Sequence, residues 1–316
     1  MPTGHEWDEF AQRCNGSYHC SQGYIAAMRL THKIHLFEFF VGKNKVGQSA
    51  VAGPYFQNSG NRVFLDTIQL CPPHEIHWPA AMKAVLQELG PGRYRYGSVL
   101  SITPSPSDDD FRRITGVTVE SIASYQVHAI TFVSWENWET YYRAISDNAK
   151  RNAAKAVKSD PNMRVESLAE WHSLPYFLQI FWMRRMMYIR KNTNLGVLAW
   201  MVRFMRRLVF LGRYVSVVRV IYHGRHTAFA CIIQFGRLSY YADGASVRDN
   251  GGSAWHLLTE IIRKSWGICP TGMFVMGFDG AGFRDQFEGW DNVLLQRQQC
   301  RVSQIATSVV TFDYHS

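Results

Sequence analysis

The 316-residue chain is 47% hydrophobic and 19% charged, and its formal net charge is +9. This hydrophobic content excludes a wholly disordered chain and suffices for a packed core, while no stretch approaches the roughly 18 uncharged apolar residues of a membrane span. The length suits one large domain or two of ordinary size. The acidic, polar start predicts no secretory signal, and the six scattered cysteines are typical of reduced thiols in a cytoplasmic protein.

The positive charge is concentrated in one part of the sequence. Between Arg143 and Arg213 there are fourteen basic and four acidic residues, whereas the rest of the chain holds twenty basic and twenty-one acidic residues. Positive charge concentrated in one segment creates an electrostatic field that favours a polyanionic partner such as nucleic acid, a nucleotide or a phosphopantetheine cofactor. The alternative interpretation is a solvated helical surface without a ligand.

The first half of the sequence alternates helix-like and strand-like segments. Residues 78–89 show the clearest helical pattern, because apolar residues recur at Met82, Val85, Leu86 and Leu89 before the glycine at Gly90. The predicted elements are a helix at 7–14, paired strands at 34–41 and 46–54, a strand at 62–70, the helix at 78–89, a strand at 94–102, a polar loop at 103–110 and a strand at 127–133.

The second half repeats this order of elements. The predicted elements are a helix at 135–158, a strand at 163–167, helices at 174–190 and 198–211, paired strands at 214–222 and 227–235, a strand at 238–242, a loop at 243–252, a helix at 253–266, and strands at 272–276 and 302–312. Each half therefore runs helix, hairpin, third strand, helix and further strand. We expect an α/β protein with mixed (α+β) sheets, built from two domains at 1–134 and 135–316.

A short loop in the second half has the composition of an anion-binding turn. Arg248 is followed by Gly251, Gly252 and Ser253, and Ser253 begins a predicted helix. Glycines before a helix allow backbone N–H groups to converge on an anion, and the helix dipole adds to the attraction. The spacing is close to the pyrophosphate loop of GNAT acyltransferases, which makes these four residues candidates for donor binding. The alternative is an ordinary turn with Ser253 as the N-cap.

Three segments together resemble the Fem-like branch of the GNAT superfamily. They are the run HGRHTAFACIIQFGRLSYYADGASVRDNGGSAWHLLTEIIRKSWGICPTGMFVMG at 223–277, the tetrapeptide GSYH at 16–19, and the helix WENWETYYRAISDNAKRNAAKAVKSD at 135–160. The resemblance implies tandem GNAT-like domains with a cleft between them that holds the active site. It also implies a transferase that moves an acyl or aminoacyl group onto an amine.

The sequence departs from the Fem pattern at three points. The inserted coiled-coil arm of tRNA-recognising members is missing, and Ala154 stands where an aliphatic residue is usual. The expected Asp-Gly pair is either replaced by Met276-Gly277 or displaced to Asp279-Gly280. The donor and acceptor therefore cannot be carried over from the family.

Acyl transfer to an amine needs a group that accepts the proton of the amine and donors for the developing oxyanion. Asp243 and Asp279 are candidate proton acceptors, because both follow predicted strands. Tyr240 and Tyr241 are candidates to protonate the leaving group or to orient the carbonyl. The alternatives are loop capping for the aspartates and core packing for the tyrosines.

Cations on two predicted helices are candidates for substrate binding. Arg151 and Lys155 are four residues apart on one helix face and therefore suit a single phosphate-bearing group. Arg203, Arg206 and Arg207 lie on an amphipathic helix whose partner is RNA, a membrane surface or the protein's own core.

Other chemistries have little support in the sequence. His74 and His77 near Cys71 have ligand types suited to zinc, but the intervening prolines and the lack of a fourth ligand argue against a metal site. No hydrolase elbow, phosphate-binding lysine loop or dinucleotide fingerprint is present.

The sequence thus predicts a cytoplasmic N-acyltransferase without a tightly bound cofactor or an integral membrane contact. Its acceptor is expected to be a small or peptide-like amine. Three alternatives stay open: transfer from aminoacyl-tRNA, transfer from acyl-CoA, and a non-catalytic nucleic-acid-binding protein on a GNAT scaffold.

Overall fold

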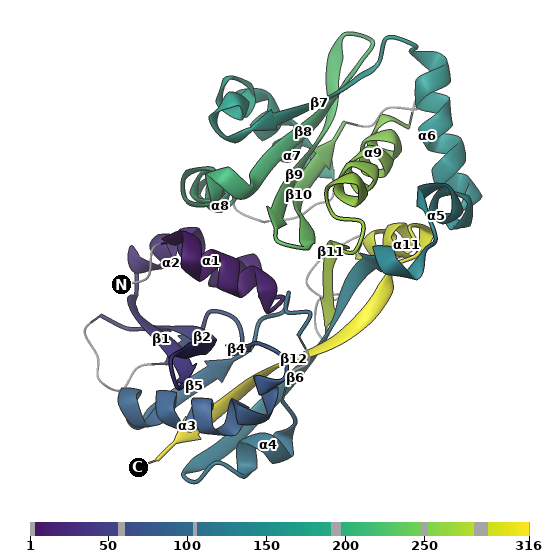
Figure 1. The fold of residues 1–316 in the computed structure, drawn as a ribbon. Helices are drawn as coiled ribbons and strands as arrows, with labels where there is room; N and C mark the ends of the chain where they lie inside the picture. The colour runs from purple at the N-terminus through teal and green to yellow at the C-terminus, as the bar shows by residue number, and fades with distance from the viewer. Residues whose placement is uncertain are drawn as a thin grey trace. The chain divides into compact units, whose positions relative to one another are not determined.

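The computed structural model describes residues 4–55, 61–103, 106–190, 197–247, 252–280 and 290–315. The chain divides into two compact units (Figure 1). Unit 1 comprises Met1–Val127, Phe278–Ala281 and Ile305–Ser316, and unit 2 comprises His128–Gly277 and Gly282–Gln304. Within the described residues, no helix has the length and apolar character needed to cross a bilayer.

This division differs from the two continuous segments expected from the sequence. The first boundary falls at Val127 rather than at residue 134, and the end of the chain belongs to unit 1 rather than to the second domain. The reason is the pairing of the last strand, β12 (Ser303–Tyr314), which lies antiparallel to β5 (Gly92–Tyr96), with Val310 opposite Tyr96.

Unit 1 is a mixed sheet with helices. Its remaining elements are α1 (Gly4–Arg13), α2 (Gln22–Arg29), β1 (Lys33–Val41), β2 (Asn44–Gly53), β3 (Arg62–Phe64), β4 (Gln69–Leu70), α3 (Trp78–Leu89), α4 (Asp108–Arg112) and the first part of β6 (Val117–Thr131), with short 3-10 turns at Tyr18–Cys20 and His74–His77. β1 and β2 form an antiparallel hairpin, and β3 runs parallel to β5.

The core of unit 1 forms where α3 packs on the sheet. Met82, Val85 and Leu86 lie on one helix face and are fully buried against Tyr94 and Phe312 of the strands. Gly90 ends the helix with a φ of 78°, a conformation that favours glycine. The helix predicted at 78–89 is therefore confirmed.

The strand predicted at 62–70 is interrupted in the structure. β3 ends at Phe64 and β4 begins at Gln69, and both pair with β2. Between them the chain turns inward at Asp66, whose side chain is buried.

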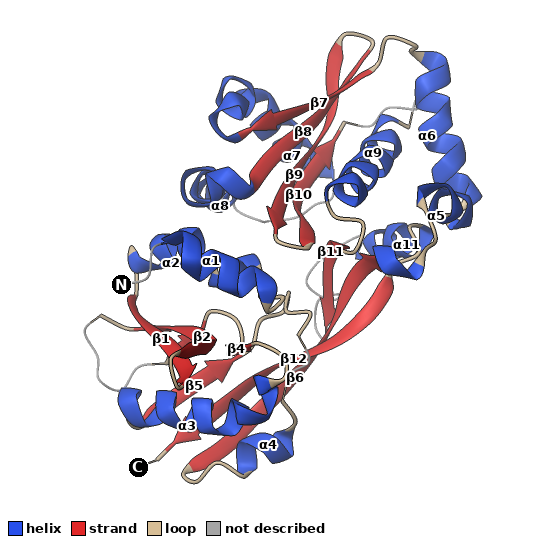
Figure 2. Ribbon diagram, in the orientation of Figure 1, coloured by secondary structure: helices blue, strands red, loops and turns tan. Residues whose placement is uncertain are grey.

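The strands of unit 2 carry helices on both faces (Figure 2). Its elements are the end of β6, α5 (Trp138–Ala144), α6 (Asp147–Ser159), β7 (Arg164–Ala169), α7 (Phe177–Arg190), α8 (Val197–Leu211), β8 (Val215–Tyr222), β9 (Arg225–Phe235), β10 (Leu238–Ser246), α9 (Ser253–Ile268), β11 (Met273–Gly280), whose last three residues belong to unit 1, α11 (Trp290–Gln299), and short 3-10 segments at Phe132–Ser134, Glu170–Tyr176 and Gly212–Tyr214.

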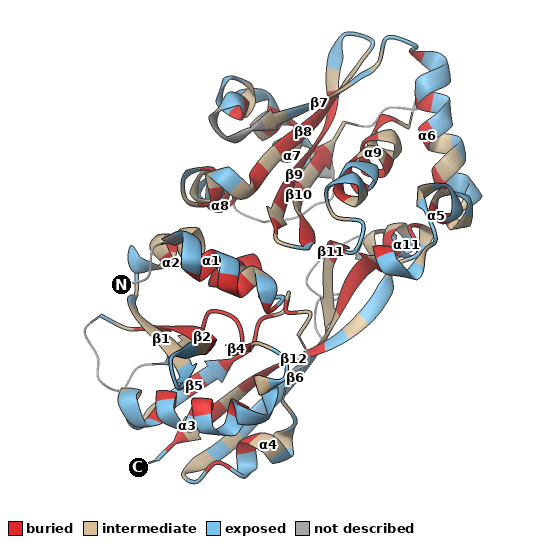
Figure 3. Ribbon diagram, viewed as in Figure 1, coloured by how far each residue is buried: buried red, intermediate tan, exposed pale blue. Residues whose placement is uncertain are grey.

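The strands β7, β8, β9 and β10 lie side by side in this order, and each is antiparallel to the next. The next neighbour of β10 in the sheet is β11, which runs parallel to it. Val218 and Ala230 point to the face covered by α9, where they meet Leu257 and Ile261. The helices α7 and α8 cover the opposite face. β8, β9 and β10 are largely buried between the two helix layers, whereas β7 is half-buried or exposed (Figure 3).

The single helix predicted at 135–158 is wrong, because two helices occupy this stretch. Ile145 is extended, with φ −61° and ψ 160°, and ends α5. Ser146 then caps α6, because its side chain accepts a hydrogen bond from the Ala149 N–H. A cap of this kind competes successfully with continuation of the helix.

Candidate active site

The two central parallel strands of unit 2 stay paired for only a short distance. Leu238, Ser239 and Tyr240 of β10 lie opposite Met273, Phe274 and Val275 of β11, and the described residues that follow in the two strands are not paired with each other. One residue further, β10 bulges against β9, because Tyr241 faces Ile232 and Asp243 faces Cys231. A bulge of this kind redirects side chains and is frequent next to active sites.

Asp243 lies directly after this bulge and is almost fully buried. Its Oδ1 is 2.8 Å from Arg184 Nη1, and its Oδ2 is 3.6 Å from Arg207 Nη1. Trp200 Nε1 donates a hydrogen bond to Oδ2, and the Gly244 N–H donates to Oδ1 at 2.8 Å. Both oxygens are thus occupied, so the carboxylate predicted as a proton acceptor holds charged and polar groups in place.

This carboxylate joins three elements of unit 2. Arg184 belongs to α7, whereas Trp200 and Arg207 belong to α8, and Asp243 belongs to β10. The side chains of Arg184 and Arg207 are each mostly buried. Taking two guanidinium groups out of water is costly unless a counter-charge accompanies them. Asp243 supplies that charge and fixes both helices to the sheet.

The neighbouring groups remain protonated near neutral pH. Burial raises the pKa of Tyr241 to about 12, an effect that Asp243 strengthens and Arg184 opposes. Burial also raises the pKa of the Cys231 thiol to about 12. Tyr241 is therefore available as a hydrogen-bond donor rather than as a base, and Cys231 is a poor nucleophile. Tyr240 is buried in β10.

Asp279, the second predicted proton acceptor, lies near the end of β11. It is only partly buried, and its Oδ1 accepts a hydrogen bond from the Gly280 N–H at 2.9 Å. It belongs to unit 1, whereas Tyr240, Tyr241 and Asp243 belong to unit 2. Unlike Asp243, this carboxyl has access to solvent.

The cations predicted to bind substrate on the first helix lie on an exposed face of α6. Arg151 and Lys155 are both exposed, as is Lys158 one turn further on. The only acidic residue in α6 is Asp147, which pairs with Lys150 at 2.9 Å. The outer face of α6 therefore carries positive charge.

The predicted donor loop meets α6 at Gly252. Arg248 and Gly251 lie outside the described residues, but Gly252 has a φ of 82° and directly precedes α9. A Cβ atom at Gly252 would overlap the carbonyl oxygen of Asn152. The absence of a side chain at this position is therefore required by contact with α6, and Gly252 lies against the residue that follows Arg151.

Ser253 faces the interior rather than the solvent. It is fully buried, and its hydroxyl lies 2.9 Å from Thr227 Oγ1 in β9. The hydroxyl of this donor-binding candidate therefore connects α9 to the sheet. An anion at this helix end would meet backbone N–H groups rather than the Ser253 side chain.

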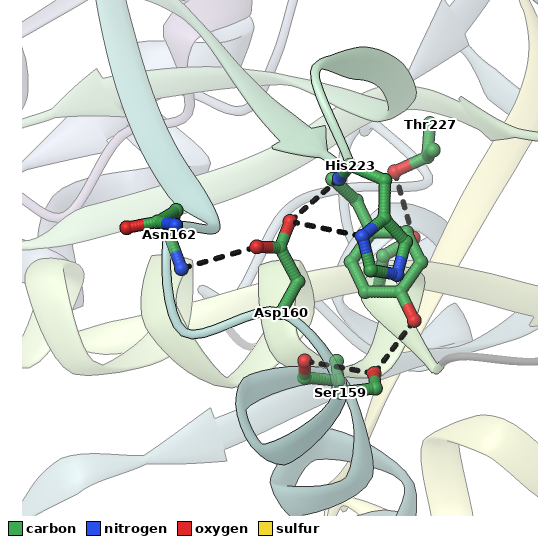
Figure 4. A network of polar contacts seen from close by, with 8 residues as sticks. Ser159, Asp160, Asn162, His223 and Thr227 are labelled. Carbon is green, nitrogen blue, oxygen red and sulfur yellow. Dashed lines mark hydrogen bonds and ion pairs between the residues drawn. The ribbon is translucent and has the colours of Figure 1, made fainter.

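Polar contacts at the end of α6 fix that helix to the β8–β9 turn (Figure 4). Asp160 accepts hydrogen bonds from the backbone N–H groups of His223 and Asn162. The Ser159 hydroxyl lies 2.6 Å from the Tyr222 hydroxyl. Together with the Thr227–Ser253 contact, these bonds connect α6, the hairpin and the start of α9. The cations of α6 are thus carried on a fixed element.

The predicted cations of α8 divide into two groups. Arg207 lies on the inner side and contacts Asp243, whereas Arg203 is exposed. Arg207 therefore serves the interior of unit 2. Arg203 is still available to an external partner.

Sequence reasoning missed Arg184, Trp200 and a buried carboxyl in unit 1. Asp66 Oδ2 accepts a hydrogen bond from the Ser17 N–H at 2.7 Å. Burial raises the pKa of Asp66 to about 6, although hydrogen bonds from Ser17 and Thr67 oppose the shift. The sequence held no local signal for this contact, because forty-nine positions separate Ser17 from Asp66.

Asp66→Asn should therefore stabilise the protein at neutral pH but not at acidic pH. A carboxyl whose pKa is raised on folding destabilises the native state above the folded pKa, and this cost disappears below the unfolded value of 3.8. We expect the variant's advantage in unfolding free energy to grow by about 2–3 kcal/mol between pH 4 and pH 7.5. Urea denaturation at four pH values measures it.

Asp147→Asn is the matched control. Hydrogen bonding to Lys150 lowers the pKa of the exposed Asp147, so this substitution should have the opposite pH dependence. If the difference in unfolding free energy between Asp66→Asn and the unsubstituted protein did not change with pH, the pKa of Asp66 would not be raised by folding.

No protein-family model and no curated protein sequence matches this chain. Solved structures do match. The chain is similar to the crystal structure of FemX, with a TM-score of 0.73, 9% identity, and coverage of 100% of this chain and 96% of FemX. It is also similar to the C-terminal domain of a putative lysylphosphatidylglycerol synthetase from Agrobacterium fabrum (TM-score 0.57, 10% identity, coverage 98% and 92%).

A third similar structure is a tandem GNAT protein from the clavulanic acid biosynthesis pathway (TM-score 0.50, 8% identity, coverage 98% and 94%). These likenesses show the fold. The chain has the mixed α/β architecture of tandem GNAT proteins, and its fold is of the Fem-like kind, as the sequence resemblance predicted.

Proposed function

We propose that this protein is an N-acyltransferase that moves an acyl or aminoacyl group onto the amine of a small or peptide-like acceptor. The observation that supports the proposal best is the bulge at Tyr241–Asp243, just beyond the point where β10 stops pairing with β11. Beyond Tyr240 the described residues of β10 are no longer paired with β11, so one side of the strand backbone at the bulge is unpaired, and Tyr241 at the bulge is protonated. Backbone donors of this kind suit an acyl carbonyl that develops negative charge.

In the proposed reaction, the amine of the acceptor attacks the carbonyl carbon of the donor, the bond to the leaving oxygen or sulfur breaks, and the amine loses one proton. This proton passes to solvent, because both oxygens of Asp243 are already occupied. Tyr241 is proposed as a hydrogen-bond donor to the carbonyl or the leaving group. Asp243 acts as a positioning residue through Arg184 and Arg207.

We propose aminoacyl-tRNA as the donor. The exposed cations Arg151, Lys155 and Lys158 follow one face of α6, and Arg151 lies next to the residue that contacts Gly252. Adjacent cations repel one another, so a face of this kind is stabilised by a polyanion. A nucleic acid presents several phosphates to such a face, whereas a single small anion engages only part of it.

The double substitution Arg151→Ala, Lys155→Ala should raise KM for aminoacyl-tRNA about tenfold or more, because each lost phosphate contact removes a charge-assisted interaction. The turnover number and the thermal midpoint should change little, since exposed cations contribute little to stability. Transfer of a radiolabelled amino acid from charged tRNA to an amine acceptor measures the first effect. Lys83→Ala, Lys264→Ala is the control, because both lysines are exposed elsewhere.

The same assay separates the alternative functions. Transfer from acyl-CoA but not from charged tRNA would replace the proposed donor while keeping the transferase. Salt-sensitive tRNA binding without any product would instead indicate a nucleic-acid-binding protein on this fold. Unchanged kinetics in the double variant would remove α6 from the donor site.

A further inference from the structure

Two neighbouring helices of unit 2 present large apolar side chains to solvent. On α7, Leu178 is 76% exposed and Trp182 is 55% exposed, and on α8, Leu198 is 73% exposed. We call the exposed set the α7–α8 face; it consists of Leu178, Trp182, Arg185, Met186 and Ile189 on α7 and Leu198, Val202, Arg203 and Val209 on α8. Solvent-exposed apolar side chains gathered in this way mark an interaction site.

The spacing of these residues is helical. Leu178, Trp182 and Ile189 follow one side of α7, opposite the buried Ile180 and Met183. α7 is therefore apolar on two sides, one facing the protein and one facing outward.

On α8, Leu198, Val202 and Val209 likewise lie opposite the buried Trp200 and Phe204. The inner sides of α7 and α8 touch each other, with the rings of Phe177 and Trp200 6.4 Å apart. Because both helices cover the same face of the sheet, both outer sides point away from it.

The charge of this region has one sign. No Asp or Glu occurs between Glu170 and Asp243, a stretch that contains both helices. Arg185 and Arg203 are exposed within the face, and the Arg185 guanidinium lies 5.6 Å from the centre of the Trp182 ring. Arginine and tryptophan beside aliphatic residues are the composition of a helix that lies in a membrane interface.

We propose that the α7–α8 face docks the protein on the surface of an anionic phospholipid bilayer. The arginines complement negatively charged headgroups, and the leucine, valine and tryptophan side chains enter the headgroup–acyl boundary. An RNA partner would satisfy the arginines but leave most of the aliphatic side chains in water. A second copy of the chain would bring the same arginines together without a counter-charge.

Sedimentation with vesicles tests this proposal without any assay of transfer. The protein should bind vesicles of equal phosphatidylglycerol and phosphatidylcholine at low salt, and bind pure phosphatidylcholine much more weakly. Leu178→Ser, Leu198→Ser should weaken partitioning about tenfold or more, because two apolar anchors are lost. Arg185→Gln, Arg203→Gln should weaken it by about fivefold per residue and reduce its dependence on salt.

Leu30→Ser, Ile76→Ser is the matched control, because both residues are exposed apolar side chains in unit 1. It should bind vesicles as the unsubstituted protein does, and Trp182→Phe should remove most of the blue shift in fluorescence that accompanies binding. Absence of binding to anionic vesicles, or equal binding by all variants, would overturn the proposal. A dimer of the unsubstituted protein that Leu178→Ser, Leu198→Ser abolishes would also overturn it, since the face would then bind a second copy. So would an Arg185→Gln, Arg203→Gln variant that loses tRNA binding but still binds vesicles.

Discussion

Asp243→Ala should lower the free energy of unfolding by about 3–5 kcal/mol. Removing one partner of a buried charge cluster leaves the remaining charges uncompensated. Here the substitution leaves Arg184 and Arg207 mostly buried without their shared carboxylate, and it removes the acceptor of the Trp200 N–H. Urea denaturation at pH 7 measures the loss, and transfer activity should fall with it because α7 and α8 lose their common anchor.

Two variants distinguish a lost counter-charge from a general disturbance. Asp243→Leu combined with Arg184→Met and Arg207→Met removes all three charges, and it should recover most of the lost stability, since apolar residues often replace a buried ion cluster without cost. Asp147→Ala breaks an exposed ion pair with Lys150 and should leave the thermal midpoint unchanged. A triple variant as unstable as Asp243→Ala would refute this account.

Gly252→Ala should lower the free energy of unfolding by about 2–5 kcal/mol. A left-handed backbone costs a non-glycine residue about 1–2 kcal/mol, and the φ of Gly252 is 82°. The added methyl group would also overlap the Asn152 carbonyl oxygen, and such overpacking costs roughly a further 1–3 kcal/mol. Because the displaced element is α6, the affinity for a polyanionic donor should also fall.

Gly224→Ala provides the comparison for this prediction. Gly224 also has a positive φ, 71°, but a Cβ atom there would meet nothing within 4 Å. Its substitution should cost only the backbone strain of about 1–2 kcal/mol. If the two alanine variants unfold at the same denaturant concentration, the close contact between Gly252 and α6 adds nothing to the cost of the substitution.

Elements with strong local signals were predictable from the sequence. The helix at 78–89 combines helical apolar spacing with a terminating glycine, and the helix observed at Ser253–Ile268 extends the predicted one by two residues. β6 was harder to predict. It begins at Val117 rather than at residue 127, because its first residues are largely exposed and show no apolar run. Tertiary pairing, not local preference, makes this stretch a strand.

The candidate site was predictable as a set of residues but not as a set of contacts. The residues at Tyr240–Asp243 and at Arg151 and Lys155 carry recognisable chemistry, so composition and spacing point to them. The partnership of Asp243 with Arg184 cannot be read from the sequence, because fifty-eight residues separate them and several other arginines are equally plausible partners. Composition predicts the charge of a region, but only the packing decides which cation turns inward.

The position of β12 has a consequence for the making of the protein. Val310, Phe312 and Tyr314 belong to the core of unit 1, where the Phe312 ring stacks on Tyr94 at 5.5 Å. When the first 127 residues have been synthesised, β12, the strand that pairs with β5, does not yet exist. Unit 1 must wait for the rest of the chain, with a strand edge open to incorrect pairing. Folding during translation is then expected to be completed first within residues 128–304, reversing the order of synthesis.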